Sequence, residues 1–386
     1  MVDDIPPKIL CVVGARPNFM KIAPIVAALK AAPRPLSVRL VHTGQHYDVA
    51  MNQRFFQQLA IPRPDVDLEV GSASHAVQTA EIMRRFEPVL DQEQPDGVLV
   101  VGDVNSTIAC ALVAAKKGVG VVHVEAGLRS RDRTMPEEIN RVLTDQLSEL
   151  LFTTEPEALD NLRAEGIDPA RVHFVGNVMI DTLRASLDKA VAAELTLAQA
   201  PDPGVFLEAP RGYGVLTLHR PSNVDDPRLL GRLLEVLGEI AREVPLVFPL
   251  HPRTEARIRS AGLEGWLASP RILPLPPQGY LEMLGLMSRA RLALTDSGGI
   301  QEETTALGVP CITLRENTER PVTLTAGTNT LAGSDPARIR QLVGEILATG
   351  GKAGRIPENW DGRAATRIAP VLSQWLYARR RSQGGS

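Results

Sequence analysis

Residues 97–126, GVLVVGDVNSTIACALVAAKKGVGVVHVEA, decide the class of fold. Two short runs within this stretch, GVLVVGD (97–103) and GVGVVHVE (118–125), are apolar and rich in β-branched residues, which is typical of buried strands. Residues 105–117 between them are expected to form a helix. Fully apolar strands that alternate with amphipathic helices are typical of a parallel sheet covered on both faces.

The same alternation of strand and helix recurs along most of the 386 residues, in two sets. A helix is also expected near residues 48–60. The rhythm breaks at the Pro- and Ala-rich residues 195–212, as in a linker or peripheral loop. We therefore expect an α/β protein with two doubly wound, Rossmann-like domains and an active site in the cleft between them. The expected domains are residues 1–180 and 181–361, and a C-terminal helix at about 362–381 packs back on the first.

Composition narrows the class of protein. The chain is 44% hydrophobic and 23% charged, with a formal net charge of −3, so it lacks the basic excess that nucleic-acid binding usually needs. No apolar run approaches the roughly 20 residues of a membrane-spanning helix. The three cysteines, Cys11, Cys110 and Cys311, are far apart and lie in apolar surroundings, as in a reduced cytoplasmic protein.

Several polar groups of the first domain follow directly after expected strands. Arg16 comes just after the run that ends at Gly14, and Lys21 lies one turn into the next helix, where it could also be an ordinary exposed lysine. Asp103 and Glu125 end two strands that we expect to be neighbours. Asp103 could simply cap a helix. Two carboxylates brought together at one sheet edge can also split their pKa values and act as acid and base.

The second domain carries a candidate anion site in TDSGGIQEETTALG, residues 295–308. Ser297, Gly298 and Gly299 would present backbone N–H groups at a helix N-terminus, and glycines allow a phosphate to approach the backbone. A tight strand–helix turn explains the same letters without any ligand. Glu302 or Glu303, one turn further on, could accept hydrogen bonds from a ribose. His219 and His251 each follow an expected strand of this domain.

Several cofactor motifs do not occur in the sequence. No Gly-x-Gly-x-x-Gly follows a strand, and no Gly-x-x-x-x-Gly-Lys-Ser/Thr phosphate loop is present. His42 and His46 have the spacing of metal ligands on a helix, but the letters HTGQH cross from a strand into a loop. We therefore expect neither a cofactor nor a metal.

The motifs together resemble those of one family, the non-hydrolysing UDP-N-acetylglucosamine 2-epimerases, which have a two-domain glycosyltransferase-B-type fold. The resemblance covers almost the whole chain. It rests on GARPNFMKIAP (14–24), HTGQHYD (42–48), VGDVNST (101–107), HVEAGLRS (123–130), MPEEINR (135–141), HRPSN (219–223), HP (251–252), TDSGGIQEE (295–303), ENTERP (316–321) and GTN (327–329).

The resemblance implies a reaction that needs no redox cofactor. UDP is eliminated from the sugar to give a glycal, and it then adds back while a proton arrives at C2 from the other face. The implied proton-transfer groups are Asp103, Glu125, Glu137 and His219. The implied substrate-binding groups are Arg16, Lys21, Arg141, His251, Gln278, Ser297, Gly298, Gly299, Glu303 and Arg320. Arg141 follows Glu137 by four residues and could hold either Glu137 or the ligand, and Glu138 is expected to be structural.

The chain also departs from the family pattern. Tyr47-Asp48 follows Gly-Gln-His where the enzymes activated by their own substrate have a basic residue, so such activation is not expected. Met283 takes the place of an aromatic residue near the uracil-contacting segment. The HRPSN motif resembles relatives that act on UDP-2,3-diacetamido-glucuronic acid, as well as archaeal-type enzymes.

The sugar substrate and the reaction class are therefore left open. The alternatives to a UDP-N-acetyl-hexosamine 2-epimerase are a UDP-2,3-diacetamido-glucuronic acid 2-epimerase, a hydrolysing 2-epimerase that releases UDP, a glycosyltransferase and, as the weakest, a nucleotide-sugar sensor. The family resemblance implies UDP and a UDP-sugar as ligands, and a homodimer in the cytoplasm.

Overall fold

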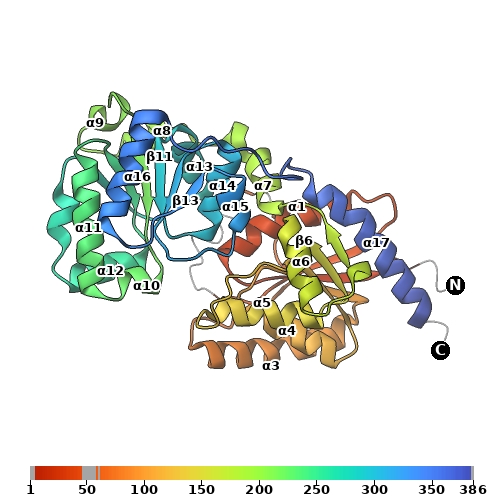
Figure 1. The fold of residues 1–386 in the computed structure, drawn as a ribbon. Helices are drawn as coiled ribbons and strands as arrows, with labels where there is room; N and C mark the ends of the chain where they lie inside the picture. Colours follow the sequence, from red (N-terminus) through yellow and green to blue (C-terminus); the bar gives the residue numbers. More distant parts are fainter. Residues whose placement is uncertain (1–4, 46–57, 60, 384–386) are drawn as a thin grey trace. The chain divides into compact units, whose positions relative to one another are not determined.

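The computed structural model describes residues 5–45, 58–59 and 61–383 (Figure 1). The chain divides into two compact units. Unit 1 consists of Met1–Arg184 and Glu358–Ser386, and unit 2 consists of Ala185–Pro357. His46, Tyr47-Asp48 and most of the helix expected near 48–60 lie outside the described residues.

Unit 1 is built on a seven-stranded sheet in the order β3-β2-β1-β4-β5-β6-β7, and all paired strands run parallel. The strand order reverses between β1 and β4, which is the topological switch point where ligands of such sheets bind. The strands are β1 Lys8–Val13, β2 Ser37–His42, β3 Val66–Asp67, β4 Gly97–Val101, β5 Gly120–Ala126, β6 Leu150–Thr153 and β7 Val172–Phe174.

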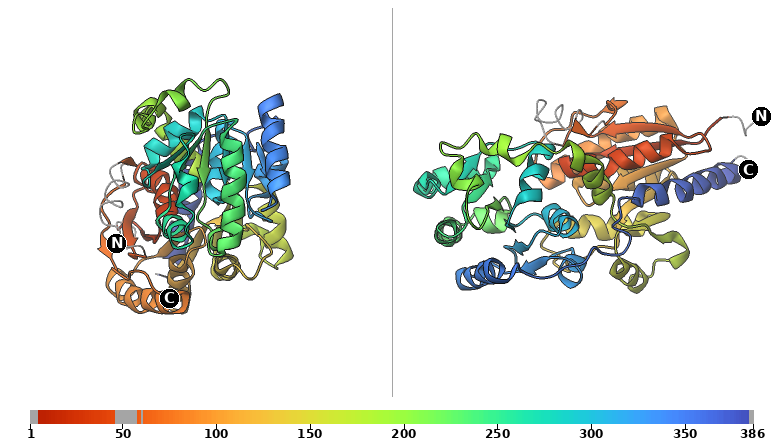
Figure 2. Two further views of the ribbon diagram at one scale, coloured as in Figure 1. Left: turned by 90° about the vertical axis from the view of Figure 1, so that its left-hand side faces the viewer. Right: turned by 90° about the horizontal axis from the view of Figure 1, so that it is seen from above.

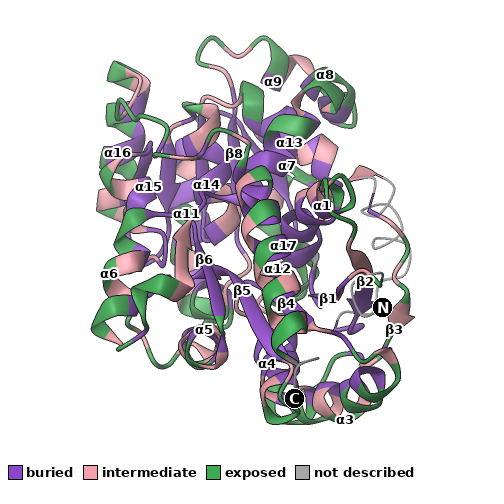
Figure 3. Ribbon diagram, turned by 90° about the vertical axis from the view of Figure 1, so that its right-hand side faces the viewer, coloured by how far each residue is buried: buried purple, intermediate pink, exposed green. Residues whose placement is uncertain are grey.

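Helices cover both faces of this sheet. On one face α1 (Arg16–Lys30) lies alongside α17 (Ala364–Gln383), and both pack on strand residues such as Val122 and Val124 (Figure 2). On the other face α3 (His75–Glu93) and α4 (Asn105–Lys116) pack on residues such as Val121. The remaining helices of unit 1 are α5 Pro136–Leu147, which packs beside α4, α6 Pro156–Ala164 and α7 Val178–Ser186. The central strands are buried along their whole length, which explains their continuous apolar sequence (Figure 3).

Unit 2 repeats the plan with a six-stranded sheet in the order β10-β9-β8-β11-β12-β13. Its paired strands are again parallel, and the order reverses between β8 and β11. The strands are β8 Gly214–Thr217, β9 Leu246–Pro249, β10 Ile272–Leu275, β11 Leu292–Thr295, β12 Cys311–Thr313 and β13 Asn329–Leu331. The helices are α8 Ala193–Leu197, α9 Gly204–Leu207, α10 Pro221–Val224, α11 Pro227–Ala241, α12 Pro252–Ser260, α13 Tyr280–Arg289, α14 Gly298–Leu307, α15 Pro321–Thr325 and α16 Pro336–Thr349.

Local sequence explains where these helices begin and end. Helices α11 and α16 each start with proline at the first helical position, after Asp226 and Asp335, whose carboxylates accept the backbone N–H two residues on. Helix α14 ends at Gly308, whose φ of 72° lies in the left-handed region that glycine adopts without strain. Two doubly wound α/β sheets were predicted from the strand–helix alternation, and this prediction is confirmed.

One expectation about an irregular segment is wrong. Residues 195–212 are not a loose linker, because Leu197 and Phe206 of the short helices α8 and α9 are buried in a core cluster of unit 2. The C-terminal end of α17 is attached to the rest of unit 1. Arg379 pairs with Glu149 and donates to the Gly118 carbonyl oxygen (2.6 Å), so it fastens the end of α17 to the sheet.

Helix α17 is held to unit 1 at its N-terminal end as well. The carboxylate of Asp181 accepts hydrogen bonds from the backbone N–H groups of Ala364 (3.0 Å) and Ala365 (2.7 Å). Burial raises the pKa of Asp181, although these two N–H groups oppose the shift. None of the helices in the described part of the chain is long and apolar enough to cross a membrane.

We expect Gly176→Ala to loosen this attachment. Gly176 has a φ of 90°, and a Cβ there would lie 2.0 Å from the carbonyl oxygen of Asn359, in the segment that leads into α17. Left-handed strain and the steric clash together should lower the free energy of unfolding by about 3 kcal/mol. The control is Gly118→Ala, where φ is 72° but no atom lies within 4 Å of the new Cβ. It should cost only the strain, about 1 kcal/mol. Urea unfolding followed by circular dichroism measures both free energies. Equal destabilisation of the two variants would contradict this explanation.

Candidate active site

The switch point of unit 1 is organised by Asn18 in the first turn of α1. Its side-chain oxygen accepts hydrogen bonds from the N–H groups of Gly14 (3.2 Å) and Ala15 (3.0 Å), and its amide donates to the Val101 carbonyl oxygen (3.0 Å). Asn18 therefore joins the ends of β1 and β4. The sequence prediction missed it, although it lies within the motif GARPNFMKIAP.

Glu125 lies in a β-bulge close to the end of β5. The register between β5 and β6 shifts between Val124 and Ala126, and Glu125 has a φ of 75°, which is rare for a residue with a side chain. Strict alternation would direct Glu125 to the same face of the sheet as His123. Instead its carboxylate forms an ion pair with Lys21, which comes from α1 on the opposite face, and both side chains are buried. Such local strain is typical of functional sites.

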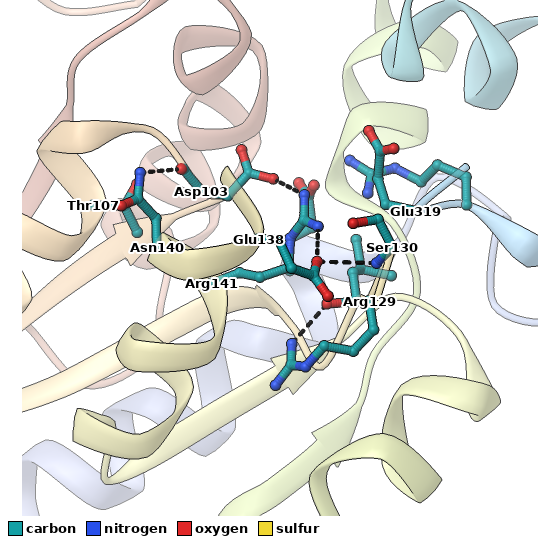
Figure 4. A network of polar contacts seen from close by, with 12 residues as sticks. Asp103, Thr107, Arg129, Ser130, Glu138, Asn140, Arg141 and Glu319 are labelled. Atoms are coloured by element: carbon teal, nitrogen blue, oxygen red, sulfur yellow. Dashed lines mark hydrogen bonds and ion pairs between the residues drawn. The ribbon is translucent and has the colours of Figure 1, made fainter. Parts of the chain in front are cut away.

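Asp103 follows β4 and pairs with Arg141 of α5 (Figure 4). The guanidinium group of Arg141 is buried and also pairs with Glu138, so it lies between two carboxylates. Glu138 in turn accepts hydrogen bonds from the backbone N–H groups of Ser130 (2.9 Å) and Arg131 (2.8 Å). Burial would raise the pKa of Glu138, but these N–H groups and the Arg141 charge lower it below its ordinary value.

The expected contact between Glu137 and Arg141 is therefore not formed. Arg141 reaches back to Glu138, three residues earlier on the same buried face of α5, whereas Glu137 is half-exposed. Glu137 makes no hydrogen bond or ion pair with any residue that the structure describes. The prediction that Glu138 is structural fits its role in fixing the loop at 130–131. Lys21, Asp103, Glu125 and Arg141 thus lie at the carboxyl-terminal edge of the unit 1 sheet. Arg16 begins α1 at the same edge.

In unit 2, His219 and Asp296 follow the strands β8 and β11 on either side of the switch point. Asp296 is buried and accepts hydrogen bonds from the backbone N–H groups of His219 and Arg220, while its Oδ1 lies 2.9 Å from His219 Nδ1. Burial alone would raise the pKa of Asp296, but the hydrogen bond and charge of His219, together with these N–H groups, lower it. The carboxylate is therefore ionised and His219 Nδ1 donates to it. The other nitrogen, Nε2, belongs to a ring that is 35% exposed and can give or take a proton.

His251 has a structural task. Its Nδ1 accepts a hydrogen bond from the Arg253 N–H (3.2 Å) and so caps the start of α12. The His251 ring is also 5.6 Å from the His219 ring, measured between centroids. Because Nδ1 accepts, the proton of a neutral His251 is on Nε2.

The glycines at the start of α14 form a tight strand–helix turn, which was the alternative to an anion site. The Ser297 N–H donates to Thr295 Oγ1 (2.9 Å) and is not presented to a ligand. A Cβ on Gly298 would lie 2.8 Å from Glu319 Oε1, so the space beside this glycine is occupied by a carboxylate. Glu319 is itself paired with Arg315 (2.9 Å). Gly298 and Gly299 open the helix, where the first N–H groups have no intrahelical partner.

Two neighbouring glutamates in α14 have different surroundings. Glu302 pairs with Arg320 (2.6 Å), and both are buried. Glu303 is also buried, and its pKa is raised to about 8 by that burial, with an opposing hydrogen bond from Tyr280 and a further upward contribution from the Glu302 charge. Arg320 therefore lies beside Glu302 rather than beside the predicted ribose-binding Glu303.

Gln278 lies just before α13, and Met283 lies in the first turn of that helix. Gln278 is half-exposed, and its side-chain amide donates to the Pro276 carbonyl oxygen (2.7 Å), which closes a local turn. Met283 is partly buried and packs against the core cluster that contains Leu286. The methionine that replaces the family's aromatic residue thus contributes to the core of unit 2.

These features define an enzyme with two doubly wound α/β units. One unit has two carboxylates, each paired with a cation, at the edge of its sheet, and the other has an Asp–His pair there. The family model described as UDP-N-acetylglucosamine 2-epimerase matches residues 27–373. The chain therefore belongs to the UDP-N-acetylglucosamine 2-epimerase family, as the sequence motifs predicted.

Individual relatives cover nearly the whole chain. A UDP-N-acetylglucosamine 2-epimerase of Methanococcus maripaludis is 42% identical over 88% of this chain and 92% of its own length. A UDP-2,3-diacetamido-2,3-dideoxy-D-glucuronate 2-epimerase of Pseudomonas aeruginosa is 41% identical over 95% of this chain and 99% of its own. The crystal structure of the Methanocaldococcus jannaschii UDP-GlcNAc 2-epimerase in complex with UDP-GlcNAc and UDP has a TM-score of 0.85 and 40% identity, and covers 95% of this chain and 99% of that one.

The raised pKa of Glu303 predicts a pH-dependent stability. As pH rises from 4.5 to about 8, the unfolded chain loses a proton that the folded chain keeps, so folding becomes less favourable over that window. Glu303→Gln mimics the protonated side chain and removes this loss. The melting temperature of the variant minus that of the unaltered protein should therefore increase as pH rises from about 5 to about 8.5. Glu264→Gln, at an exposed position of the same unit, is the control. A constant difference across this range in thermal denaturation would contradict the prediction.

Proposed function

We propose that this protein inverts C2 of a UDP-N-acetyl-hexosamine, of the type UDP-N-acetylglucosamine to UDP-N-acetylmannosamine. The C2–H bond and the C1–O bond break, a protein group takes the proton, and UDP leaves with the electron pair of the C1–O bond. UDP then adds back to the glycal while a proton is delivered to the opposite face of C2. The observation that carries the proposal is the pair of cation-bound carboxylates at the sheet edge of unit 1, Glu125 buried and Asp103 partly exposed, in a chain that belongs to the 2-epimerase family.

We propose Glu125, Asp103 and Glu137 as the groups that move protons. Glu125 is supported by its strained bulge, because a residue held at a φ of 75° is maintained against a conformational cost. Lys21 and Arg141 hold Glu125 and Asp103 in place through ion pairs, and a positioned carboxylate can act as a general base. Glu137 makes no fixing contact within the described residues and can change its protonation state without breaking an ion pair.

We propose that unit 2 holds UDP. His219 is directed by the ionised Asp296 and can donate to the phosphate oxygens or assist proton transfer. The N-terminus of α14 at Gly298 and Gly299 favours an anion, and Glu303 is the proposed ribose partner. Further binding groups are proposed from the motifs, and they are Arg16, His251, Gln278, Ser297 through its side chain, and Arg320.

The particular sugar has two candidates. The relatives named as UDP-N-acetylglucosamine and UDP-2,3-diacetamido-glucuronate 2-epimerases are 42% and 41% identical to this chain, so identity favours neither. We place UDP-N-acetylglucosamine first because the M. jannaschii relative, 40% identical in sequence, was solved with it.

We also propose a homodimer in the cytoplasm. Ile139 and Leu143 of α5 and Val77 of α3 are large apolar side chains exposed on the helices of unit 1, as expected of an association surface. Three buried free thiols suit a reducing compartment. The molar mass in solution, measured by light scattering, tests the dimer.

The function is tested by incubating the protein with each candidate UDP-sugar in heavy water and following the reaction by NMR. We expect an equilibrium mixture of the two C2 epimers, with deuterium at C2 because the added proton comes from solvent-exchanged groups. Epimer formation without deuterium would exclude the elimination route. Steady release of free UDP would identify the hydrolysing variant, and no turnover without an acceptor would favour a glycosyltransferase.

Glu137→Gln should lower kcat by about 100-fold while UDP binding, measured by calorimetry, stays intact, because an acid–base group is lost and no ion pair is broken. Asp103→Asn and Glu125→Gln should have at least as large an effect, and each also leaves Arg141 or Lys21 with less compensation. Glu157→Gln, exposed in the first turn of α6, is the control. Near-normal turnover in all three site variants would remove the proposed proton transfer.

A further inference from the structure

His123 is a fully buried histidine on β5 that the motif HVEAGLRS contains but the proposed chemistry does not use. Its Nδ1 lies 2.7 Å from Asp145 Oδ1 on α5, and its Nε2 lies 2.8 Å from the carbonyl oxygen of Gly102 at the end of β4. The single ring therefore connects three elements, and two of them carry the site residues Asp103 and Arg141.

The two partners of His123 determine its protonation. A backbone carbonyl oxygen only accepts hydrogen bonds, so Nε2 must carry a proton. Asp145 is fully buried between His123, the Gly127 N–H (3.1 Å) and the guanidinium of Arg129 (2.7 Å), and these donors favour its carboxylate form. An ionised carboxylate also only accepts, so Nδ1 must carry the second proton.

Further charged groups lie behind the contact between His123 and Asp145. Arg129 is shared between Asp145 and Glu165 at the end of α6, at 2.5 Å from Glu165 Oε2. The charged groups that connect to His123 are thus Asp145 and, behind it, Arg129 and Glu165, two negative and one positive. Asp145 and Arg129 are buried, whereas the Glu165 side chain is 29% exposed and is also stabilised by water.

We propose that His123 is a positioning residue that donates hydrogen bonds from both ring nitrogens, which fixes the Gly102–Asp103 turn relative to α5 and so sets the pairing of Asp103 with Arg141. Gly102 has a φ of 67°, so the turn that presents Asp103 depends on a conformation that few residues adopt. The ring holds the carbonyl of that turn, while its contact with Asp145 holds α5 four residues beyond Arg141. Asn140, the neighbour of Arg141, donates to the Asp103 carbonyl oxygen (2.9 Å) and ties the same two elements together on the other side of the turn.

The protonation of the ring is tested first on the unaltered protein, labelled with ¹⁵N-histidine. The chain has 7 histidines, and the spectrum of a His123→Gln variant assigns the signal of His123. We expect both ring nitrogens of His123 to carry a proton at neutral pH, because each of them faces an acceptor. One unprotonated ring nitrogen at neutral pH would overturn the proposal. This measurement does not depend on which reaction the protein catalyses.

The positioning role is tested with two substitutions that each retain one contact. A glutamine amide at 123 can reach the place of Nε2 and donate to the Gly102 carbonyl oxygen, whereas an asparagine amide reaches only the place of Nδ1. We expect His123→Asn to lower kcat for UDP-N-acetylglucosamine by about 100-fold with little change in KM, because a misplaced catalytic group slows the reaction without contacting the substrate. His123→Gln should retain about tenfold more kcat than His123→Asn. His173→Asn, on the edge strand β7 of the same sheet, is the control.

Hydrogen exchange supplies a readout that is independent of turnover. In His123→Asn the backbone amides of residues 102–105 should exchange faster, while His173→Asn leaves them unchanged. The kinetic arm rests on the proposed epimerisation. If that function is wrong, the unaltered protein shows no turnover, while NMR and exchange still decide the protonation of the ring and the turn. Equal kcat in both His123 variants, a raised KM with unchanged kcat, or unaltered exchange in His123→Asn would each overturn the positioning role.

Discussion

Parallel strand direction is the constraint on which the rest of this structure depends. Every strand pairing in both sheets is parallel, so all strands of a sheet end at the same edge. Strand interiors are mostly apolar because helices cover both faces, and most polar groups of the central strands therefore lie at the ends. In unit 1 this brings together residues as distant in sequence as Lys21 and Glu125. In unit 2 it brings His219 to Asp296. Neither pair needs a long loop to form, because the sheet itself supplies the proximity.

The buried charges of unit 1 are expensive to maintain. Removing a carboxylate and an ammonium group from water costs several kcal/mol per ion before the pair recovers any of it, and a packed apolar pair is often no less stable. The chain nevertheless buries Glu125, Lys21 and Arg141, and holds Glu125 in a strained bulge. A stability argument alone would replace these groups with apolar side chains. Their presence is better explained by chemistry that needs carboxylates whose position and charge are both fixed.

The sequence predicted the two parallel sheets because period and composition are local properties. It also predicted that Asp103 and Glu125 follow strands, since strand ends are visible in the letters. It did not predict which face each side chain uses. The bulge that turns Glu125 towards α1 inserts one unpaired residue into β5. No local pattern in the letters HVEAG predicts this bulge. In the same way Glu137 and Glu138 are indistinguishable as letters, and only the packing of α5 decides that Glu138 pairs with Arg141. The proline-rich composition of residues 195–212 led to the prediction of a linker or peripheral loop. Leu197 and Phe206 within this segment are core residues.

The two Asp–His pairs show how the second partner of a histidine decides its chemistry. In both units a buried, ionised aspartate accepts a hydrogen bond from Nδ1. At His219 the ring is partly exposed, so Asp296 would orient the group that we propose as a phosphate donor or proton-transfer group. At His123 the ring is fully buried and Nε2 donates to a backbone carbonyl oxygen, so Asp145 helps to hold the ring in place. The short sequence around a histidine does not separate these cases, because the deciding acceptor at His123, the Gly102 carbonyl, belongs to another strand. A motif therefore identifies the residues worth examining, and the tertiary hydrogen bonds identify which of them can react.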